Sequence, residues 1–569
     1  MQLFLSQKGY VASKHVLIFN QIAKEIRLPF TLLIDSLSKG QQGNIDWWVS
    51  SPMSRDNLAS PLFSSCCSLV LLQVLLKEKE NINLISTDSL VLKKVIKKYL
   101  KENGFNIPVV CEIKYSQIFK QLVFPVLRWL WICIRELYQW FQVNRVINTY
   151  TKIYNKPLTL IDTYIVGSYN ENKDRYYEGL WNNLDKMEQD TLYFVPTIIV
   201  DPKNEYKEQL LRMSQSKKNF LFKEKFLKLR DYLFVFLYPF RIAFQIIPQH
   251  EFMGFNIVPL IKSELRSMTA FNQVCIALLN YRFAKRLKNN GVMLRLVMNW
   301  FENQILDKGW NLGFRKFYPK TLTVGYAGYF VSQNWLARYP SENEFQSLVI
   351  PEKICVVGRG LIESTKLFCD NLDVVAAPAF RFQSVWEKRK YIPNDKHFNI
   401  LIALPILMKE TVEILRLVAT SIEITTMSNL RIRLKAHPLL FPEKIKLAFG
   451  RNWPSLFEFV KGDFNDCIEK SHLLVSNASS VCVETLAKGI PVILVGGQTG
   501  LTQNPIPETI TDDIWKLCYT PEEMVNAVEF YASRNEEKVK QHQETGGNIR
   551  ENYFEPITRD SVYNLLQYN

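Results

Sequence analysis

The stretch SHLLVSNASSVCVETLAKGIPVILVG, Ser471–Gly496, contains two short apolar runs separated by small polar residues and one amphipathic segment. The runs HLLV and PVILV have the length of buried strands, and the serines between them are residues that begin helices. Gly489 and Pro491 end the helix and introduce the second strand. A strand, a helix and a strand in this order predict a βαβ unit, and therefore a parallel sheet.

The sequence on both sides extends this pattern. Apolar runs resembling strands occur at His397–Pro405 (HFNILIALP) and Leu430–Pro438 (LRIRLKAHP). A helical pattern occupies Lys409–Thr425, and another is opened by Thr520-Pro521, a capping residue followed by proline in the first turn. We therefore predict a Rossmann-like domain that begins between Ala379 and His397 and is assigned to residues 381–569.

The N-terminal half alternates helical and strand-like segments. A helix is expected at FNQIAKEI, and strands are expected at FTLLIDS (30–36), NINLIST (81–87), LIDTYIVGS (160–168) and TLYFVPTII (191–199). Repetition of strand and helix predicts an α/β domain over residues 1–380, with helical insertions accounting for its length. The predicted fold class is thus α/β, with two Rossmann-like domains facing a cleft.

Composition narrows the class of partner. The chain has 569 residues, 47% hydrophobic and 22% charged, and a formal charge of +15, as expected for a folded protein that meets anionic partners. No nucleic-acid motif is present, which favours an anionic membrane surface or anionic substrates over nucleic acid. Ten cysteines without a CxxC pair, and no cleavable signal, indicate reduced thiols and a cytoplasmic location.

Two apolar segments, Ile118–Gln142 and Tyr232–Pro248, are interrupted by charges before they reach the roughly 20 apolar residues of a membrane span. In the first segment, a polar residue recurs every seven positions: Gln121, Arg128, Arg135 and Gln142. This stripe is typical of a helix lying in the membrane interface or of one buried in a large core, and both alternatives stay open. Pro125 argues against a single straight helix.

Polar residues follow the predicted C-terminal strands, where ligands bind in open α/β sheets. Pro438 ends one strand and leaves His437 at its carboxyl end. The turn after the next strand carries four candidate phosphate-binding residues, Ser476, Asn477, Ser479 and Ser480. Glu484 lies one helical turn further, where it can accept hydrogen bonds from ribose hydroxyls. Turn formation and helix capping would each explain one of these features, but their order predicts a nucleotide site.

These motifs resemble a known group of proteins. KAHP followed by SNASSVCVETLAKGIPVILVG resembles the donor domain of GT-B glycosyltransferases of bacterial surface polysaccharides, above all those using CMP-activated sialic acid-like sugars or Kdo. The strings DWWVSSPMSRDN, YNENKDRYYEGL and WFENQILDKGWNLGFRK are similar to a surface carbohydrate biosynthesis family that spans nearly the whole chain.

The resemblance implies a GT-B-like bacterial enzyme that moves a nonulosonate from a CMP donor to a surface glycan, in capsule or lipopolysaccharide, or to a lipid-linked acceptor. It implies donor contacts from His437 and Pro438, a phosphate site completed by Ser479 and Ser480, and ribose binding by Glu484. The alternatives are a CDP-glycerol-type polyol-phosphate transferase and a non-catalytic glycan- or nucleotide-binding scaffold. The expected location is the inner face of the cell membrane, as a peripheral protein.

The sequence also nominates catalytic residues. It has no DxD string, so we expect a metal-independent reaction without a cofactor, in which His437 stabilises the leaving phosphate. Glu302, beside Trp300, is the preferred general base, and Asp174 and Asp46 are its rivals. Three guanidinium groups are candidates for binding a substrate carboxylate, those of Arg55, Arg175 and Arg315.

Overall fold

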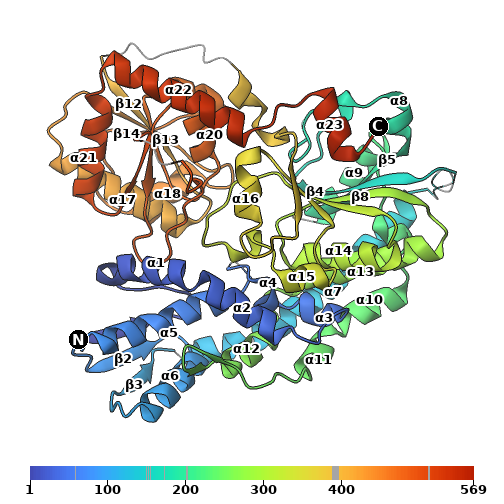
Figure 1. Ribbon diagram of the computed structural model, residues 1–569, viewed down its shortest axis with the longest axis horizontal. Helices are drawn as coiled ribbons and strands as arrows, with labels where there is room; N and C mark the ends of the chain where they lie inside the picture. Colours follow the sequence, from blue (N-terminus) through green and yellow to red (C-terminus); the bar gives the residue numbers. More distant parts are fainter. Residues whose placement is uncertain are drawn as a thin grey trace.

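The computed structural model describes residues 1–57, 59–113, 115–148, 150, 153, 155–171, 174–199, 203–387, 396–510 and 513–568, with the side chains of 115–122 and 203–204 excluded. Three parallel sheets organise the chain into an N-terminal, a middle and a C-terminal unit (Figure 1). A two-stranded antiparallel hairpin, β6 (Glu251–Phe252) and β7 (Phe255–Asn256), is added to them.

The C-terminal unit is a six-stranded parallel sheet with the strand order β14-β13-β12-β15-β16-β17. Its strands are β12 (Phe398–Ala403), β13 (Leu430–Lys435), β14 (Phe457–Phe459), β15 (Leu473–Ser476), β16 (Val492–Val495) and β17 (Trp515–Cys518). Its helices are α17 (Met408–Ile424), α18 (Pro442–Phe449), α19 (Phe464–Glu469), α20 (Val481–Ala487), α21 (Pro521–Ala532) and α22 (Glu536–Tyr553). The predicted strands and helices are confirmed, as is Thr520 as the cap of α21. The strand order reverses between β12 and β15, as in a Rossmann fold.

The middle unit is a second six-stranded parallel sheet, with the order β11-β10-β9-β8-β4-β5. Its strands are β4 (Leu158–Val166), β5 (Leu192–Ile199), β8 (Leu294–Trp300), β9 (Leu322–Ala327), β10 (Lys353–Val356) and β11 (Asp373–Ala376). The order reverses between β4 and β8. Helices α13 (Phe271–Asn289) and α14 (Ile305–Phe317) pack so closely that a Cβ at Gly309 would lie 1.9 Å from the Ala277 carbonyl oxygen.

The chain returns to the middle unit after α22. Helix α23 (Arg559–Leu566) lies beside this sheet in Figure 1, apart from the other helices near it in sequence. Arg295 of β8 donates to the Leu566 carbonyl oxygen at 2.9 Å, and its guanidinium lies 4.0 Å from the Tyr568 ring centroid. The two Rossmann-like sheets and this return confirm the predicted α/β, GT-B-like class.

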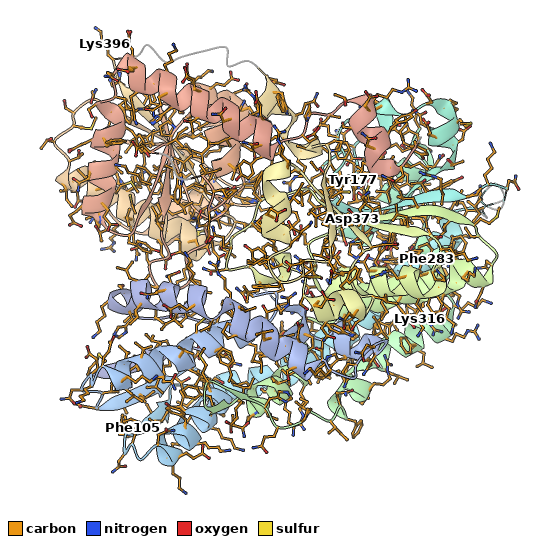
Figure 2. All side chains as sticks on the ribbon, in the orientation of Figure 1. Phe105, Tyr177, Phe283, Lys316, Asp373 and Lys396 are labelled. Atoms are coloured by element: carbon orange, nitrogen blue, oxygen red, sulfur yellow. The ribbon has the colours of Figure 1, made fainter. Side chains whose placement is uncertain are left out.

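The N-terminal unit is a feature that the sequence did not reveal. It has its own parallel sheet of β1 (Gln2–Leu5), β2 (Leu84–Thr87) and β3 (Val109–Cys111), so the expected single α/β domain over 1–380 holds two sheets. Its larger helices are α1 (Val16–Glu25), α2 (Arg27–Leu37), α5 (Leu62–Lys77) and α6 (Leu90–Glu102). Phe105, which follows α6, lies at the end of this unit farthest from the other two sheets (Figure 2).

The strand predicted at residues 30–36 is wrong, because this segment belongs to α2. Phe30, Ile34 and Leu37 recur at helical spacing and are buried, and the Phe30 ring lies 5.1 Å from that of Phe63. The run is shorter than two helical turns, so its period could not be told from that of a strand. The remaining helices are α3 (Ile45–Trp48), α4 (Ser51–Ser54), α8 (Lys186–Thr191), α9 (Lys203–Ser214), α12 (Val258–Leu265), α15 (Glu342–Gln346) and α16 (Ile362–Thr365).

Three helices form an outer layer below the middle sheet in Figure 1: α7 (Tyr115–Val146), α10 (Leu229–Phe236) and α11 (Tyr238–Ala243). Helix α7 runs through Pro125 as one element. Within the described residues, no helix is both long enough and apolar enough to cross a membrane. Nine of the ten cysteines are buried and all ten are free, as predicted for thiols packed as small apolar side chains.

Candidate functional site

The two large sheets each have a point where strand order reverses, and ligands of open α/β sheets bind outside the carboxyl ends of the strands at such points. In the C-terminal unit this point lies after β12 and β15, and in the middle unit it lies after β4 and β8. The residues predicted to bind the donor substrate follow β13 and β15. Glu302 follows β8, and Arg175 follows β4. The candidate site is therefore built from four strand ends.

His437 lies two residues beyond β13 and is half-buried, while Pro438 beside it is exposed. The Leu439 amide donates to His437 Nδ1 at 3.2 Å. Because Nδ1 accepts, the neutral ring carries its proton on Nε2. Burial, with a smaller contribution from the charge of Arg175, lowers the pKa of His437. The imidazole is thus held neutral, with Nε2–H available as a hydrogen-bond donor.

The serine-rich turn divides into structural and accessible residues. The buried Ser476 hydroxyl donates to the Ala403 carbonyl oxygen at 2.9 Å and joins the ends of β15 and β12, so its predicted phosphate contact is wrong. Asn477 donates from Nδ2 to Glu410 at 3.2 Å. Ser479 and Ser480 are half-buried at the start of α20, where the Ser480 side chain caps no backbone amide of the helix. The last two residues remain candidates for phosphate binding.

Glu484 lies on α20, one turn after Ser480, whose hydroxyl donates to Glu484 Oε1 at 3.4 Å. Burial raises the pKa of Glu484 to about 7, and the charge of Arg381 opposes this rise. An ionised carboxylate only accepts hydrogen bonds, whereas the protonated form also donates one. The ability of Glu484 to accept hydrogen bonds from the two hydroxyls of a ribose therefore changes near neutral pH.

Glu302 lies two residues beyond β8 and is held by two donors. Trp300 Nε1 donates to Oε1 and Gln304 Nε2 donates to Oε2, each at 2.7 Å. Burial raises the pKa of Glu302, against the Trp300 hydrogen bond and the charges of Arg381 and Arg175. A carboxylate with a raised pKa is a better proton acceptor near neutral pH, as a general base must be.

The charge of Arg381 acts on candidate residues of both the middle and the C-terminal units. The sequence did not reveal this residue. It belongs to the 3-10 segment Phe380–Trp386, which follows the last strand of the middle sheet, and is exposed. Its guanidinium carbon lies 5.6 Å from the Trp300 ring centroid, and its charge acts on both Glu302 and Glu484. The string AFRFQSVW carries no recognisable motif, so only the fold could reveal this position.

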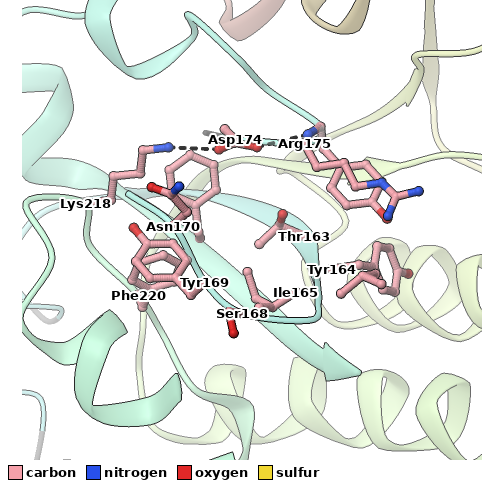
Figure 3. A pocket seen from close by; sticks show the side chains of 13 residues that line it. Thr163, Tyr164, Ile165, Ser168, Tyr169, Asn170, Asp174, Arg175, Lys218 and Phe220 are labelled. Carbon is pink, nitrogen blue, oxygen red and sulfur yellow. Dashed lines mark hydrogen bonds and ion pairs between the residues drawn. The ribbon is translucent and has the colours of Figure 1, made fainter. Parts of the chain in front are cut away.

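Arg175 borders a small cavity of about 70 Å³ at the carboxyl end of β4 (Figure 3). Asp174, in the same wall, accepts from Lys218 at 2.9 Å and from the Tyr176 and Tyr177 amides at 3.0 Å each. Figure 3 shows the Arg175 guanidinium pointing away from the Asp174–Lys218 pair. Arg175 is exposed, and its charge acts on both Glu302 and His437.

The other arginine candidates have structural partners. Arg55 is fully buried and pairs with the buried Glu344 at 2.5 Å. Arg315 donates to the carbonyl oxygens of Phe345 and Ile350, at 3.4 and 3.2 Å. Arg55 thus joins the N-terminal unit to α15, and Arg315 holds two carbonyl groups of the middle unit. Their predicted contacts with substrate stay predictions. Arg175 is the candidate that keeps an accessible charge.

The rival bases are also engaged. Asp46 forms a two-point ion pair with Arg241, at 2.6 and 2.7 Å, in the helical layer. Asp174 has the three donors given above. Glu302 differs from both because its hydrogen-bond partners, Trp300 and Gln304, are neutral. In the part of the chain that the structure describes, no three His, Cys, Asp or Glu side chains are grouped so that they could hold a metal ion.

No protein-family model matches the sequence, and no curated protein matches it. Solved structures give distant likenesses. A putative UDP-N-acetylglucosamine 2-epimerase from Listeria monocytogenes is 12% identical, covers 72% of this chain and 95% of its own, and has a TM-score of 0.42. MurG of Acinetobacter baumannii is 12% identical over 73% of this chain and 100% of its own, with a TM-score of 0.39.

The lipopolysaccharide outer core galactosyltransferase WaaB is 10% identical over 72% of this chain and 99% of its own, with a TM-score of 0.38. At these identities and TM-scores the likenesses say nothing about substrate or reaction. The fold assignment rests on the strand orders of the two large sheets.

Proposed function

We propose that the protein is a GT-B-type glycosyltransferase whose donor binds at the carboxyl edge of the C-terminal sheet and whose acceptor binds at that of the middle sheet. The observation that carries the proposal is the shared guanidinium of Arg381, which acts on Glu302 of the middle unit and Glu484 of the C-terminal unit. The candidate base and the candidate ribose ligand are thus both within range of the charge of one guanidinium group.

Each residue has a defined part in this proposal. Glu484 accepts from the ribose hydroxyls, and His437 Nε2–H, with the hydroxyls of Ser479 and Ser480, donates to the leaving phosphate. Glu302 takes the proton of the acceptor hydroxyl as that oxygen bonds to the anomeric carbon. Arg175 pairs with an acidic group of the acceptor. The proposed transfer uses no metal ion and no cofactor.

The proposed donor is a CMP-activated sugar of the sialic acid or Kdo kind. Its support is the order of the motifs: His437-Pro438 after one strand, Ser479, Ser480 and Glu484 after another, and Gly489 and Pro491 before a third. Other nucleotides and CDP-glycerol are the alternatives that a binding test must separate.

Thermal unfolding with CMP, CDP, CDP-glycerol, UDP and GDP at equal concentration provides this test, because a ligand that binds only the folded state raises its apparent stability. CMP should raise the unfolding temperature most, and the His437→Ala variant should lose this increase. The Leu447→Ala variant, at an 83% exposed position of α18, is the matched control. A larger shift with UDP, or with CDP-glycerol, would replace the CMP-sugar donor.

We also propose that the enzyme works at the inner face of the membrane, through the outer layer of α7, α10 and α11. In α7 the exposed side chains include Phe124, Leu127, Trp131, Ile134 and Phe141. Trp129 of the same helix donates to the Phe236 carbonyl oxygen and so ties α7 to α10.

The apolar surface continues beyond α7. Leu233 and Phe240 are exposed on α10 and α11, and Phe244 and Ile246, just beyond, are 84% and 85% exposed. The basic residues Arg128, Arg145, Lys228 and Arg230 are exposed in or next to these helices. Exposed apolar groups with basic neighbours are typical of surfaces that enter an anionic bilayer interface. A lipid-linked acceptor would then reach the middle unit from the membrane.

A further inference from the structure

A cavity of about 340 Å³ lies between the N-terminal unit and the carboxyl edge of the C-terminal sheet. One wall comes from Lys8, Gly9, Tyr10, Asn57 and Ser64 of the N-terminal unit. The opposite wall comes from the start of α17, from Asn477, and from the loop that follows β16. Its volume is at the lower end of the range for small-molecule sites, about 300–1,000 Å³.

Direct contacts hold the two walls together. The Val11 amide donates to the Thr499 carbonyl oxygen at 2.9 Å. Asn20 of α1 accepts from the Thr502 amide at 2.7 Å and donates to the Gly500 carbonyl oxygen at 3.2 Å. Figure 1 shows α1 directly beneath the C-terminal unit. The N-terminal unit is therefore a built wall of this cavity.

The cavity has an excess of hydrogen-bond acceptors. Asn477 donates from Nδ2 to Glu410 at 3.2 Å. Asn57 donates from Nδ2 to the Asn334 carbonyl oxygen at 2.6 Å. The Oδ1 atoms of both asparagines are buried and have no hydrogen-bond partner among the described residues. Asn477 is only 8% exposed. Two asparagines from two different units, each with a buried amide oxygen that has no partner among the described residues, thus belong to the lining of one cavity.

The acceptor excess defines the class of ligand. Buried polar groups are normally paired, so a ligand that supplies hydroxyl or N–H donors would complete this wall. Glu410, whose pKa is raised by burial, adds a further acceptor. Lys8 is exposed on the N-terminal wall and provides a cation for an acidic substituent. Lys409 and Glu413, which also line the cavity, pair with each other and leave Lys8 as the cation without an ion pair in the part of the chain that the structure describes. A polyhydroxylated, N-acylated sugar acid supplies hydroxyl and N–H donors for the asparagines and an acidic group for Lys8.

We infer that this cavity binds the glycosyl group of the donor, and that the N-terminal unit is its sugar-recognising wall. The inference rests on the proposed function, because Asn477 belongs to the same turn as Ser479 and Ser480, where the donor phosphate is placed. A sugar linked to that phosphate has the cavity within its reach, while the ribose extends toward Glu484.

The test compares CMP with CMP-N-acetylneuraminate by isothermal titration calorimetry. The wild type should bind the sugar nucleotide more tightly than CMP. Asn57→Leu removes one orphaned acceptor and should weaken binding of CMP-N-acetylneuraminate by about tenfold, while CMP affinity stays within about twofold. Asn81→Leu, an exposed position of the same unit outside the cavity, should change neither affinity.

Each outcome has a separate meaning. If the wild type does not bind CMP, the proposed donor is wrong and the inference falls with it. If CMP binds and Asn57→Leu keeps the wild-type ratio of the two affinities, the inference alone is overturned. Should Asn57→Leu lose its cooperative thermal transition, Lys8→Ala decides instead: a selective loss of CMP-N-acetylneuraminate affinity supports the inference, and an unchanged ratio overturns it.

Discussion

The guanidinium of Arg381 lies over the indole of Trp300, with 5.6 Å between its carbon and the ring centroid. Trp300 ends β8, and its Nε1 holds the carboxylate of Glu302. The contact therefore places a cation from the connection between the two large sheets beside the candidate base. Because the same charge acts on Glu484, the protonation of the two carboxyl groups is coupled to one side chain.

Glu302→Gln should abolish glycosyl transfer without changing nucleotide affinity. Glutamine keeps the shape and can still accept from Trp300, but it cannot take a proton from the acceptor. Transfer assays and calorimetry with CMP would separate the two effects. Asp46→Asn and Asp174→Asn are the comparison variants. An inactive Asp174→Asn that binds CMP, beside an active Glu302→Gln, would move the base to Asp174.

His437→Ala and Ser480→Ala should each lower the transfer rate by on the order of 10²-fold, because each removes one donor to the leaving phosphate. Neither side chain belongs to the buried core, so the thermal transition should remain close to that of the wild type. Ser476→Ala, which breaks the bond between β12 and β15, should instead lower stability. Near-normal turnover in both His437→Ala and Ser480→Ala would place the phosphate site elsewhere.

The affinity for CMP should fall as pH decreases through about 7. Burial raises the pKa of Glu484 to about 7, so this carboxylate gains a proton as the pH decreases. It then loses the charge that strengthens its hydrogen bonds with the ribose. Titrations between pH 6 and 8 should show the decrease in the wild type and a flatter profile in Glu484→Gln. The nucleotide phosphate titrates equally in both experiments, so the difference between the profiles reports Glu484. Identical profiles would remove Glu484 from the ribose site.

Phe124→Glu and Phe244→Glu should each reduce binding to vesicles that contain anionic lipid. Both positions are exposed in or next to the outer helical layer, and a carboxylate there opposes insertion and repels the lipid charge. Co-sedimentation at low and at physiological salt would measure the effect. Leu447→Glu, in the C-terminal unit, is the control and should bind as the wild type does. Equal binding to neutral and anionic vesicles would contradict the electrostatic contribution.

Arg55→Ala should lower the free energy of unfolding by about 3–5 kcal/mol, because it leaves Glu344 buried with one of its two cations removed. Burial alone would raise the pKa of Glu344, but the charges of Arg55 and Lys308 hold it below its ordinary value. Denaturant titration would measure the loss. Arg212→Ala, which breaks an exposed pair with Glu208, should cost no more than about 1 kcal/mol.

The sequence predicted β12, β13, β15 and β16 because each is a short apolar or alternating run bounded by turn residues, as at Leu473–Ser476. It did not predict β14 and β17, which have three and four residues. It predicted the N-terminal half less well. Helix α2 is too short and too apolar for its period to be read, and strand β1 has only four residues. For the candidate site, residues within motifs were found, whereas Arg381 was not. Its role depends on which strand ends face one another, and this information is absent from local sequence.

The position of α23 has a consequence for biosynthesis. This helix covers β8 and β4 through Arg295 and Thr159, yet the ribosome makes it only after all six strands of the C-terminal sheet. Until then Arg295 keeps its hydrogen bond to Thr159 but lacks its carbonyl acceptors, those of Leu566 and Gln567. Domains generally fold in order of synthesis. The middle sheet therefore stays without the cover of α23 while the C-terminal sheet forms. A chaperone that holds this nascent surface would therefore increase the yield of native protein.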